Sequence, residues 1–352
     1  MTNPRWLRRA AVPVAVVVVV VTTLLFVVVL GGFDLSRALA ALWSGSIGSS
    51  YAFFSETLVR ATPLILLGLS VAIAFRAGIF NIGAEGQLLA GATAAVGVGL
   101  GFPQLPGAIL VLAELVAAGI GGALFASIAA VLKRRFGVLE VISTLMLNFV
   151  ARYAVSYLVH GPLQEPSHAY PQSGALSAAA RLPIIIPGQQ THLGLLIALL
   201  FAGVLWWYLR STAVGFRVRV VGAGPIAAAS SGGIDVPRVV FGVFLVSGAI
   251  AGLAGGIEAT GVTYALYEDI SPGLGYSAIA VALLARLHPL AVVIAALFFG
   301  ALEAGATAMQ RDAGVPAVFV AVVEALVILG VLAAGRVRTR IAPDRPAAEP
   351  VV

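Results

Sequence analysis

The chain has 352 residues, of which 60% are apolar and only 10% charged, and its mean hydropathy is +1.05. Soluble domains are about half apolar and about a quarter charged, so this composition excludes an ordinary water-soluble globular protein. The net charge is +6, and the absence of cysteine excludes disulfides, thiolate metal sites and cysteine nucleophiles. Charge-free runs at 10–33 and 239–257 are long enough to cross a bilayer as helices. The sequence predicts an all-α, polytopic membrane protein.

The N-terminal segment begins with a basic stretch, "MTNPRWLRR", followed by a long apolar run. This order resembles a signal peptide, but the run exceeds a typical signal core and no clean cleavage site follows it. We therefore expect residues 1–10 to be a cytoplasmic N-terminus before a retained first span, with cleavage as the alternative.

Hydropathy predicts about ten membrane-spanning helices, within a range of eight to ten. The eighth is short enough to be a broken or re-entrant helix. An eight-span version without the eighth and ninth segments also keeps both termini on one side, but it leaves much apolar sequence unplaced. The ten segments are 11–31, 57–75, 84–102, 107–132, 138–159, 192–210, 239–258, 275–287, 289–309 and 316–334.

The distribution of basic residues orients these spans. With the N-terminus in the cytoplasm, sixteen lysines and arginines fall in inner segments and three, Arg37, Arg181 and Arg311, in outer ones. Both termini are therefore expected to be cytoplasmic. The expected domain plan is a transmembrane domain, 11–335, with an external loop, 160–191, a cytoplasmic loop, 211–238, and a disordered cytoplasmic tail, 336–352.

A polar stretch, "GIFNIGAEGQ", interrupts two apolar segments. Gly78 suits a helix stop, Asn81 an N-cap, and Glu85 the first turn of the next helix, where the helix dipole favours an anion. Broken backbone at membrane depth is tolerated where it lines an aqueous cavity, and the competing interpretation is a hydrated turn at the inner surface. The candidate substrate-pathway residues are Phe80, Asn81, Glu85, Gln87 and, within the fifth span, Asn148.

Four stretches together resemble the permeases of ABC importers of the nucleoside and simple-sugar type, within the superfamily of branched-chain amino acid and ribose permeases. They are "FRAGIFNIGAEGQLLAGA", "EVISTLMLN", "GFRVRVVGAGPIAAASSGGI" and "ISPGLGYSAIAVALLARLHPL", and the resemblance covers about residues 57–335. The string Asn-Ile-Gly-Ala-Glu-Gly-Gln is similar to that of the nucleoside branch, which works with a receptor lipoprotein.

The resemblance implies that 211–238 contains a helix that docks on an ATPase. Its candidate residues are Gly215, Arg217, Arg219, Gly222, Gly224 and Pro225. The segment "GAGPIAAASSGGI" differs from family loops in having no acid before Asp235, which leaves a specific charged contact with the ATPase unsupported. The same loop contains Gly-x-Gly-x-x-Ala, but it is too short for a dinucleotide-binding unit.

Charged residues within the spans are functional candidates, with structural ion pairs as the alternative. Arg152 and Glu258 both fall in the outer halves of their spans, so they are expected to be able to pair. Three glycines four residues apart predict close helix packing. The charged set is Glu114, Arg152, Glu258, Glu303 and Glu324, and the glycines are Gly248, Gly252 and Gly256.

No P-loop occurs in the sequence, and the four histidines lack the spacing of metal ligands. No combination of serine, histidine and acidic residues suggests a catalytic site. We therefore expect no enzyme activity, no metal and no cofactor in this chain, with ATP and Mg held by a partner ATPase. The resemblance implies an importer of nucleosides in a bacterial plasma membrane, with purine nucleosides as the expected substrates. Expected partners are the ATPase, a second permease (paralogous or identical), the external lipoprotein and membrane lipid, but no nucleic acid.

Three alternatives stay open at this point. A simple-sugar permease is the nearest competitor. A proton-coupled secondary transporter would use the intramembrane glutamates, and a scaffold or channel would show no saturable uptake.

Overall fold

The computed structural model describes residues 31–316 and the isolated positions Thr22, Phe26, Val318, Val322 and Ala325. Apart from these positions and their edge residues, the predicted spans 11–31 and 316–334 lie outside the described residues. So do Glu324 and the predicted terminal segments 1–10 and 336–352.

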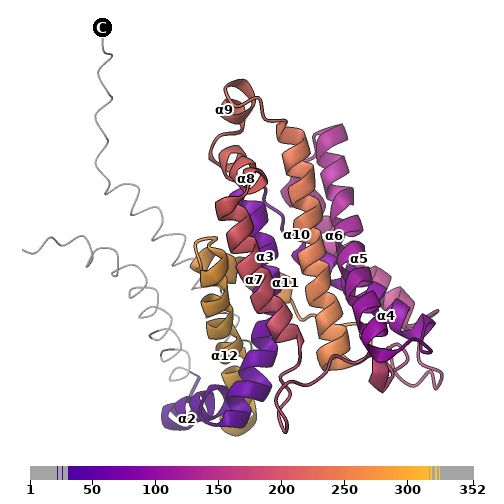
Figure 1. Cartoon of the computed structure of the whole chain (residues 1–352). Coiled ribbons are helices and arrows are strands. Elements are labelled where there is room, and N and C mark those ends of the chain that lie inside the picture. The colour runs from indigo at the N-terminus through magenta and orange to yellow at the C-terminus, as the bar shows by residue number, and fades with distance from the viewer. Residues whose placement is uncertain are drawn as a thin grey trace, which may run out of the picture.

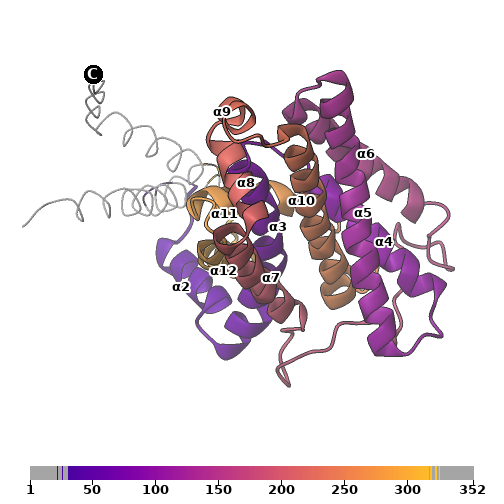
Figure 2. The same ribbon diagram turned by 45° about the horizontal axis from the view of Figure 1, so that its top comes forward.

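Every regular element of the described part is helical (Figures 1 and 2), and only three isolated bridges pair extended residues there. The α-helices are α2 (Leu35–Ser46), α3 (Leu58–Arg76), α4 (Ala84–Gly101), α5 (Gly107–Phe136), α6 (Glu140–Val159), α7 (Gly194–Ser211), α8 (Ala213–Ala223), α9 (Pro225–Ser230), α10 (Val236–Glu258), α11 (Leu274–Leu284) and α12 (Pro289–Ala313). Short π-helical turns, Ala52–Thr57 and Ala259–Thr263, adjoin α3 and α10, and a 3₁₀ turn is at Ala178–Ala180.

The eight predicted spans that fall in the described part each coincide with a helix, with ends within four residues of the prediction. Six described helices, with their adjoining turns, are long and apolar enough to cross a membrane: α3, α5, α6, α7, α10 and α12. α4 is 18 residues long, whereas α11 has only 11 residues, about 16 Å of helix at 1.5 Å per residue. α11 therefore does not cross a bilayer alone.

Two helices, α2 and α8, were not predicted from the sequence. α2 starts at an N-cap, since Asp34 Oδ1 accepts a hydrogen bond from Arg37 N at 3.1 Å. α8 starts in the same way at Thr212, whose Oγ1 accepts from Gly215 N at 3.0 Å. Hydropathy did not find them because neither helix has the length or the continuous apolar character of a span.

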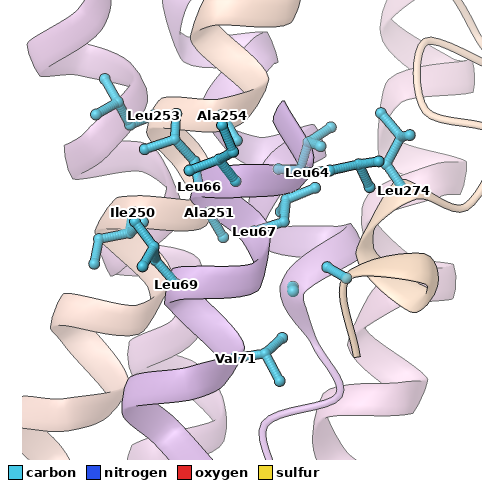
Figure 3. Close-up of a cluster of buried hydrophobic side chains, with 14 of the residues drawn as sticks. Leu64, Leu66, Leu67, Leu69, Val71, Ile250, Ala251, Leu253, Ala254 and Leu274 are labelled. Atoms are coloured by element: carbon cyan, nitrogen blue, oxygen red, sulfur yellow. The ribbon is translucent and has the colours of Figure 1, made fainter. Parts of the chain in front are cut away.

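α3 is the centre of the bundle. Its leucines pack against Ile250, Ala251 and Ala254 of α10 and against Leu274 of α11 (Figure 3). Residues from Ala61 to Ala74 are buried on all sides of the helix, whereas α5, α6 and α7 each expose a long apolar face. A helix that is apolar all round is a core helix, and helices with one exposed apolar face suit the lipid boundary. Burial thus places α3 inside the bundle and α5 to α7 at its edge.

Glycines allow α10 to lie directly against α4 and α5. A Cβ added at Gly252 would overlap the carbonyl oxygen of Ala118 on α5, and one at Gly248 would overlap Gly122. A Cβ on Gly256 would lie 2.5 Å from the Ala118 side chain. Such close backbone approach is the use of small residues at four-residue spacing in membrane helices.

Replacing Gly252 by leucine is expected to prevent stable folding, because overpacking typically costs about 1–3 kcal/mol and here the overlap is with the backbone of α5 at both Ala118 and Gly122. Gly242→Leu, on the same helix, is the matched control, since a Cβ at Gly242 meets nothing within 4 Å. Thermal unfolding in detergent measures both. Equal melting temperatures for the two variants would contradict the packing account.

The two ends of the bundle carry different structures. α8 and α9 lie together at one end, and the 160–191 loop lies at the other (Figure 1). The loop has its own internal order: Gln172 and Ser167 donate hydrogen bonds to Glu165 at 2.7 and 2.8 Å and lower the pKa of its carboxyl. The loop is a structured cover rather than a loose connection.

This loop is bonded to the segment that follows α10. Ser173 N donates to Leu266 O at 2.9 Å, Leu176 N to Tyr264 O at 2.8 Å, and Leu182 N to Thr260 O at 2.9 Å. A displacement of the loop would therefore be passed to the chain between α10 and α11.

Candidate functional site

The bundle contains two interruptions that reach inward from opposite ends. α3 ends at Arg76, Gly78 adopts a left-handed conformation with φ of 74°, and α4 starts only at Ala84. The second interruption is the non-helical stretch 264–273 between α10 and α11. Both lead to helix N-termini, those of α4 and α11.

Asn81 is at the depth of the middle of α10. Its Nδ2 donates to Ser247 Oγ at 2.9 Å and to Gln87 Oε1 at 3.1 Å, and Gln87 Nε2 donates back to Asn81 Oδ1 at 3.0 Å. Ser247 in turn bonds to Ser70 of α3. All four side chains are buried, so the hydrated-turn interpretation does not hold for Asn81 or Gln87. Their bonds join α3, α4 and α10.

The N-termini of α4 and α11 meet at Glu85. Its Oε2 accepts a hydrogen bond from Gly275 N at 2.7 Å, and a Cβ on Gly275 would overlap the backbone nitrogen of Glu85. Glu85 is only 7% exposed. Its carboxylate therefore caps α11 from another helix, where the unpaired N–H groups and the helix dipole favour an anion.

Asn148 of α6 holds the beginning of α4. Its Oδ1 accepts from Gly86 N at 2.9 Å, and its Nδ2 donates to Ile82 O at 2.9 Å and to Tyr276 Oη at 3.1 Å. One amide side chain thus contacts the first interruption and the first turn of α11. Because these bonds use most of its capacity, Asn148 is a positioning group as well as part of the cavity wall.

Arg152 does not pair with Glu258, and that expectation was wrong. Arg152 binds Asp269 at 2.9 Å, and Ser156, one turn further along α6, donates to Glu268 at 2.7 Å. α6 packs on α4 and α5, while Glu258 lies in the electrostatic field of Arg60. Helix depth alone could not reveal that the 264–273 stretch returns to α6. Since the Arg152 and Asp269 side chains are 60% and 70% exposed, the pair is worth about 0–1 kcal/mol and can open.

These groups surround a cavity of about 460 Å³. Its wall offers carboxylates, an amide, a phenol, a hydroxyl and one guanidinium, together with the ring of Phe149. Small-molecule sites of this size bind through a few convergent polar groups and apolar faces. The lining residues are Glu85, Leu89, Asn148, Phe149, Arg152, Glu268, Asp269, Ser271, Pro272, Gly273 and Tyr276.

Four of the polar side chains in this wall were not predicted as site residues: Glu268, Asp269, Ser271 and Tyr276. The signal was present in "YEDISPGLGY", where two acids precede a Ser-Pro-Gly break. An arginine predicted to lie within a span favours an acidic partner. Glu268 and Asp269 could have been considered beside Glu258, but the sequence alone does not choose among these acids.

Several sequence candidates lie elsewhere. Phe80 is 54% exposed and packs edge-on against Phe75, with ring centres 5.3 Å apart. Glu114 is fully buried beside Gly99, and within the described residues neither of its carboxylate oxygens has a hydrogen-bond partner. Glu303 is partly buried on α12. None of these lines the cavity with Glu85.

The predicted docking segment is a pair of helices. Pro225 is the first residue of α9 and follows Gly224, which separates α9 from α8. Gly222 abuts the end of α3, because a Cβ there would overlap the carbonyl oxygen of Arg76, and Gly215 likewise abuts Tyr208 of α7. At the tip, the Ile226 side chain is 84% exposed. The Gly-x-Gly-x-x-Ala motif that begins at Gly222 follows the helix α8. A dinucleotide-binding motif follows a strand, so this one lacks the required structure.

Interrupted helices whose N-termini meet at a polar cavity are typical of membrane transport proteins. The chain belongs to the family described as branched-chain amino acid transport system / permease component, whose model matches residues 53–332.

Individual relatives are similar over most of their length. The guanosine ABC transporter permease protein NupP of Bacillus subtilis is 39% identical over 88% of this chain and 89% of its own. The glucose ABC transporter permease protein TsgB13 of Haloferax volcanii is 40% identical over 83% and 80%. The guanosine ABC transporter permease protein NupQ of Bacillus subtilis is 32% identical over 69% and 78%.

Proposed function

We propose that this chain is the membrane-spanning permease subunit of an ATP-driven importer of nucleosides, with purine nucleosides as the first substrates to test. The observation that carries the proposal is the cavity at Glu85, where the N-termini of α4 and α11 meet. It is combined with the similarity to the guanosine permease NupP.

The chemistry of the wall suits a neutral, hydroxylated solute. Glu268, Asp269 and Glu85 offer carboxylate oxygens that accept hydrogen bonds from hydroxyl groups. Phe149 and Tyr276 offer aromatic faces on which a flat base can stack. A ribose joined to a purine presents both kinds of group.

The remaining parts of the importer are proposed from the same comparison. ATP and Mg bind to a separate ATPase, which docks on α8 and α9 around the exposed Ile226. Two guanosine permeases of one organism, NupP and NupQ, both resemble this chain, which supports a paralogous second permease over an identical one. An external binding lipoprotein delivers substrate over the 160–191 loop.

A sugar importer is the second candidate, favoured by the glucose permease relative. It would use the same carboxylates for sugar hydroxyls but would leave the aromatic faces without a stacking partner.

The test is uptake of radiolabelled guanosine, adenosine, cytidine, ribose and glucose into vesicles that carry the chain with its neighbouring permease, ATPase and receptor. We expect guanosine or adenosine to accumulate in the vesicles only when ATP is present. This accumulation should be lost when the ATPase lacks its P-loop lysine. Uptake of glucose or ribose alone would establish the sugar importer. Accumulation that persists without the ATPase and collapses with an uncoupler would overturn both in favour of proton coupling.

A further inference from the structure

A second groove, unrelated to the central cavity, lies at the α8 end of the bundle. It has a volume of about 260 Å³ and is formed by α7, α8 and α10, with Ile73 of α3 in its wall. These three helices lie on the near face of the molecule in Figure 1. It is separate from the Glu85 cavity, with which it shares no residue.

The interior of the groove is apolar. Val218, Val239 and Val243 line it together with the more exposed Val214 and Val246. Gly242 is in the same wall, and a Cβ added there would meet nothing within 4 Å. The groove therefore contains open space beside Gly242, bounded by branched aliphatic side chains.

Its mouth is basic. Arg217 of α8 and Arg238 of α10 both belong to the lining. Arg238 is bonded to Asp235 at 3.0 Å, whereas the Arg217 side chain makes no ion pair or hydrogen bond with the described residues. Asp235 compensates one of the two arginines, and the mouth keeps one uncompensated positive charge.

The mouth also lies at the level where spans end. α7 ends at Ser211 and α10 begins at Val236, and near the end of α7 the Arg210 guanidinium is 5.5 Å from the centre of the Trp206 ring. Trp207 is 57% exposed. Tryptophan and arginine together at span ends mark the headgroup region of a bilayer.

We propose that this groove is a binding site for one anionic phospholipid of the leaflet at the α8 end. The phosphate lies between Arg217 and Arg238, and one acyl chain lies along the valines toward Gly242. Basic pockets between membrane helices bind anionic headgroups in this way. A free phosphate would use the arginines but would leave the apolar wall without an occupant. Because Arg217 is on α8, the lipid would join the membrane to that helix.

The experiment is quenching of Trp206 and Trp207 fluorescence by lipids with brominated acyl chains, in nanodiscs of fixed bromolipid fraction. Trp6 and Trp43 are replaced by phenylalanine so that the signal comes from these two residues. Brominated phosphatidylglycerol is expected to occupy the site about fivefold more tightly than brominated phosphatidylcholine, as about one net charge near a membrane surface implies.

Two variants separate the parts of the site. The double variant Arg217→Gln, Arg238→Gln removes the preference for phosphatidylglycerol and leaves quenching at the phosphatidylcholine level. Gly242→Phe fills the acyl space with the charges intact and reduces quenching by both lipids. Matched controls are Arg134→Gln with Arg135→Gln at the end of α5, and Gly97→Phe, where a Cβ also meets open space.

Equal quenching of the wild type by the two lipids would overturn the proposal. So would a phosphatidylglycerol preference that survives Gly242→Phe, or one that millimolar inorganic phosphate abolishes, because the site would then hold a free anion. Should the arginine double variant fail to fold, the wild-type titration and Gly242→Phe decide the question alone.

Discussion

Replacing Glu85 by alanine is expected to abolish uptake and to lower the thermal stability of the chain. The substitution leaves Gly275 N–H buried without its acceptor and removes the group that joins α4 to α11. An unsatisfied buried donor costs about 1–3 kcal/mol, and more when the lost partner is charged. Transport suffers further because the same carboxylate lines the cavity. Uptake of the labelled nucleoside and melting in detergent measure the two effects.

Glu85→Gln separates the structural role from the chemical one. The amide oxygen still accepts from Gly275, so the folded protein should be retained. A neutral hydrogen bond is roughly half as strong as a charge-assisted one, so uptake should fall about tenfold. Glu114→Gln is the matched control, because Glu114 is a buried glutamate outside the cavity. Wild-type uptake by Glu85→Gln would restrict Glu85 to holding the helices, and loss of uptake in Glu114→Gln instead would favour proton coupling.

The second large effect is expected at the α8 end of the bundle, at Ile226. Its side chain is 84% exposed, the largest exposed fraction among the large apolar side chains of the described residues, and α9 with its six residues is too short to face lipid as a span. Ile226→Asp should leave folding unchanged and reduce ATP-driven uptake by about 30-fold or more, as loss of an anchor worth about 2–4 kcal/mol implies. Co-purification of the ATPase and uptake by the same vesicles are the measurements.

Ser230→Asp, on the same short helix, introduces the same charge at another exposed position and is expected to be nearly neutral. If both variants co-purify with the ATPase as well as the wild type does, α9 is not the docking element. If neither variant co-purifies with the ATPase, the loss of binding is caused by the added negative charge and not by the loss of the isoleucine side chain.

The long helices were predictable from hydropathy, since a run of about 20 apolar residues has few alternatives in a membrane, whereas α2 and α8 were not. The position of α10 against its neighbours was suggested by the spacing of Gly248 and Gly252. Hydropathy could not give the depth of a residue in the bundle. It left open whether 78–83 lies at membrane depth or forms a turn near the surface, whereas the hydrogen bond to Ser247 places Asn81 beside the middle of α10.

The cavity was only partly predictable for the same reason. Glu85 and Asn148 stand out as polar residues in apolar surroundings. Asp269 and Tyr276 come from a stretch whose return into the bundle depends on contacts with α6 and with the 160–191 loop. Such long-range contacts leave no periodic signal in one sequence, and they also decided the partner of Arg152.

The meeting of two helix N-termini has a mechanical consequence. An uninterrupted helix is a stiff rod, and a push at one end arrives at the other. Here Gly222 of α8 contacts Arg76 and Ala77, where the chain leaves α3 for α4, and the 160–191 loop is bonded to Leu266, in the chain that leads to α11. Each connection leads to the N-terminus of a separate helix, α4 or α11. Under the proposed function, we therefore expect the effect of receptor binding and the effect of ATP binding to enter through different connections and to meet at the contact between Glu85 and Gly275.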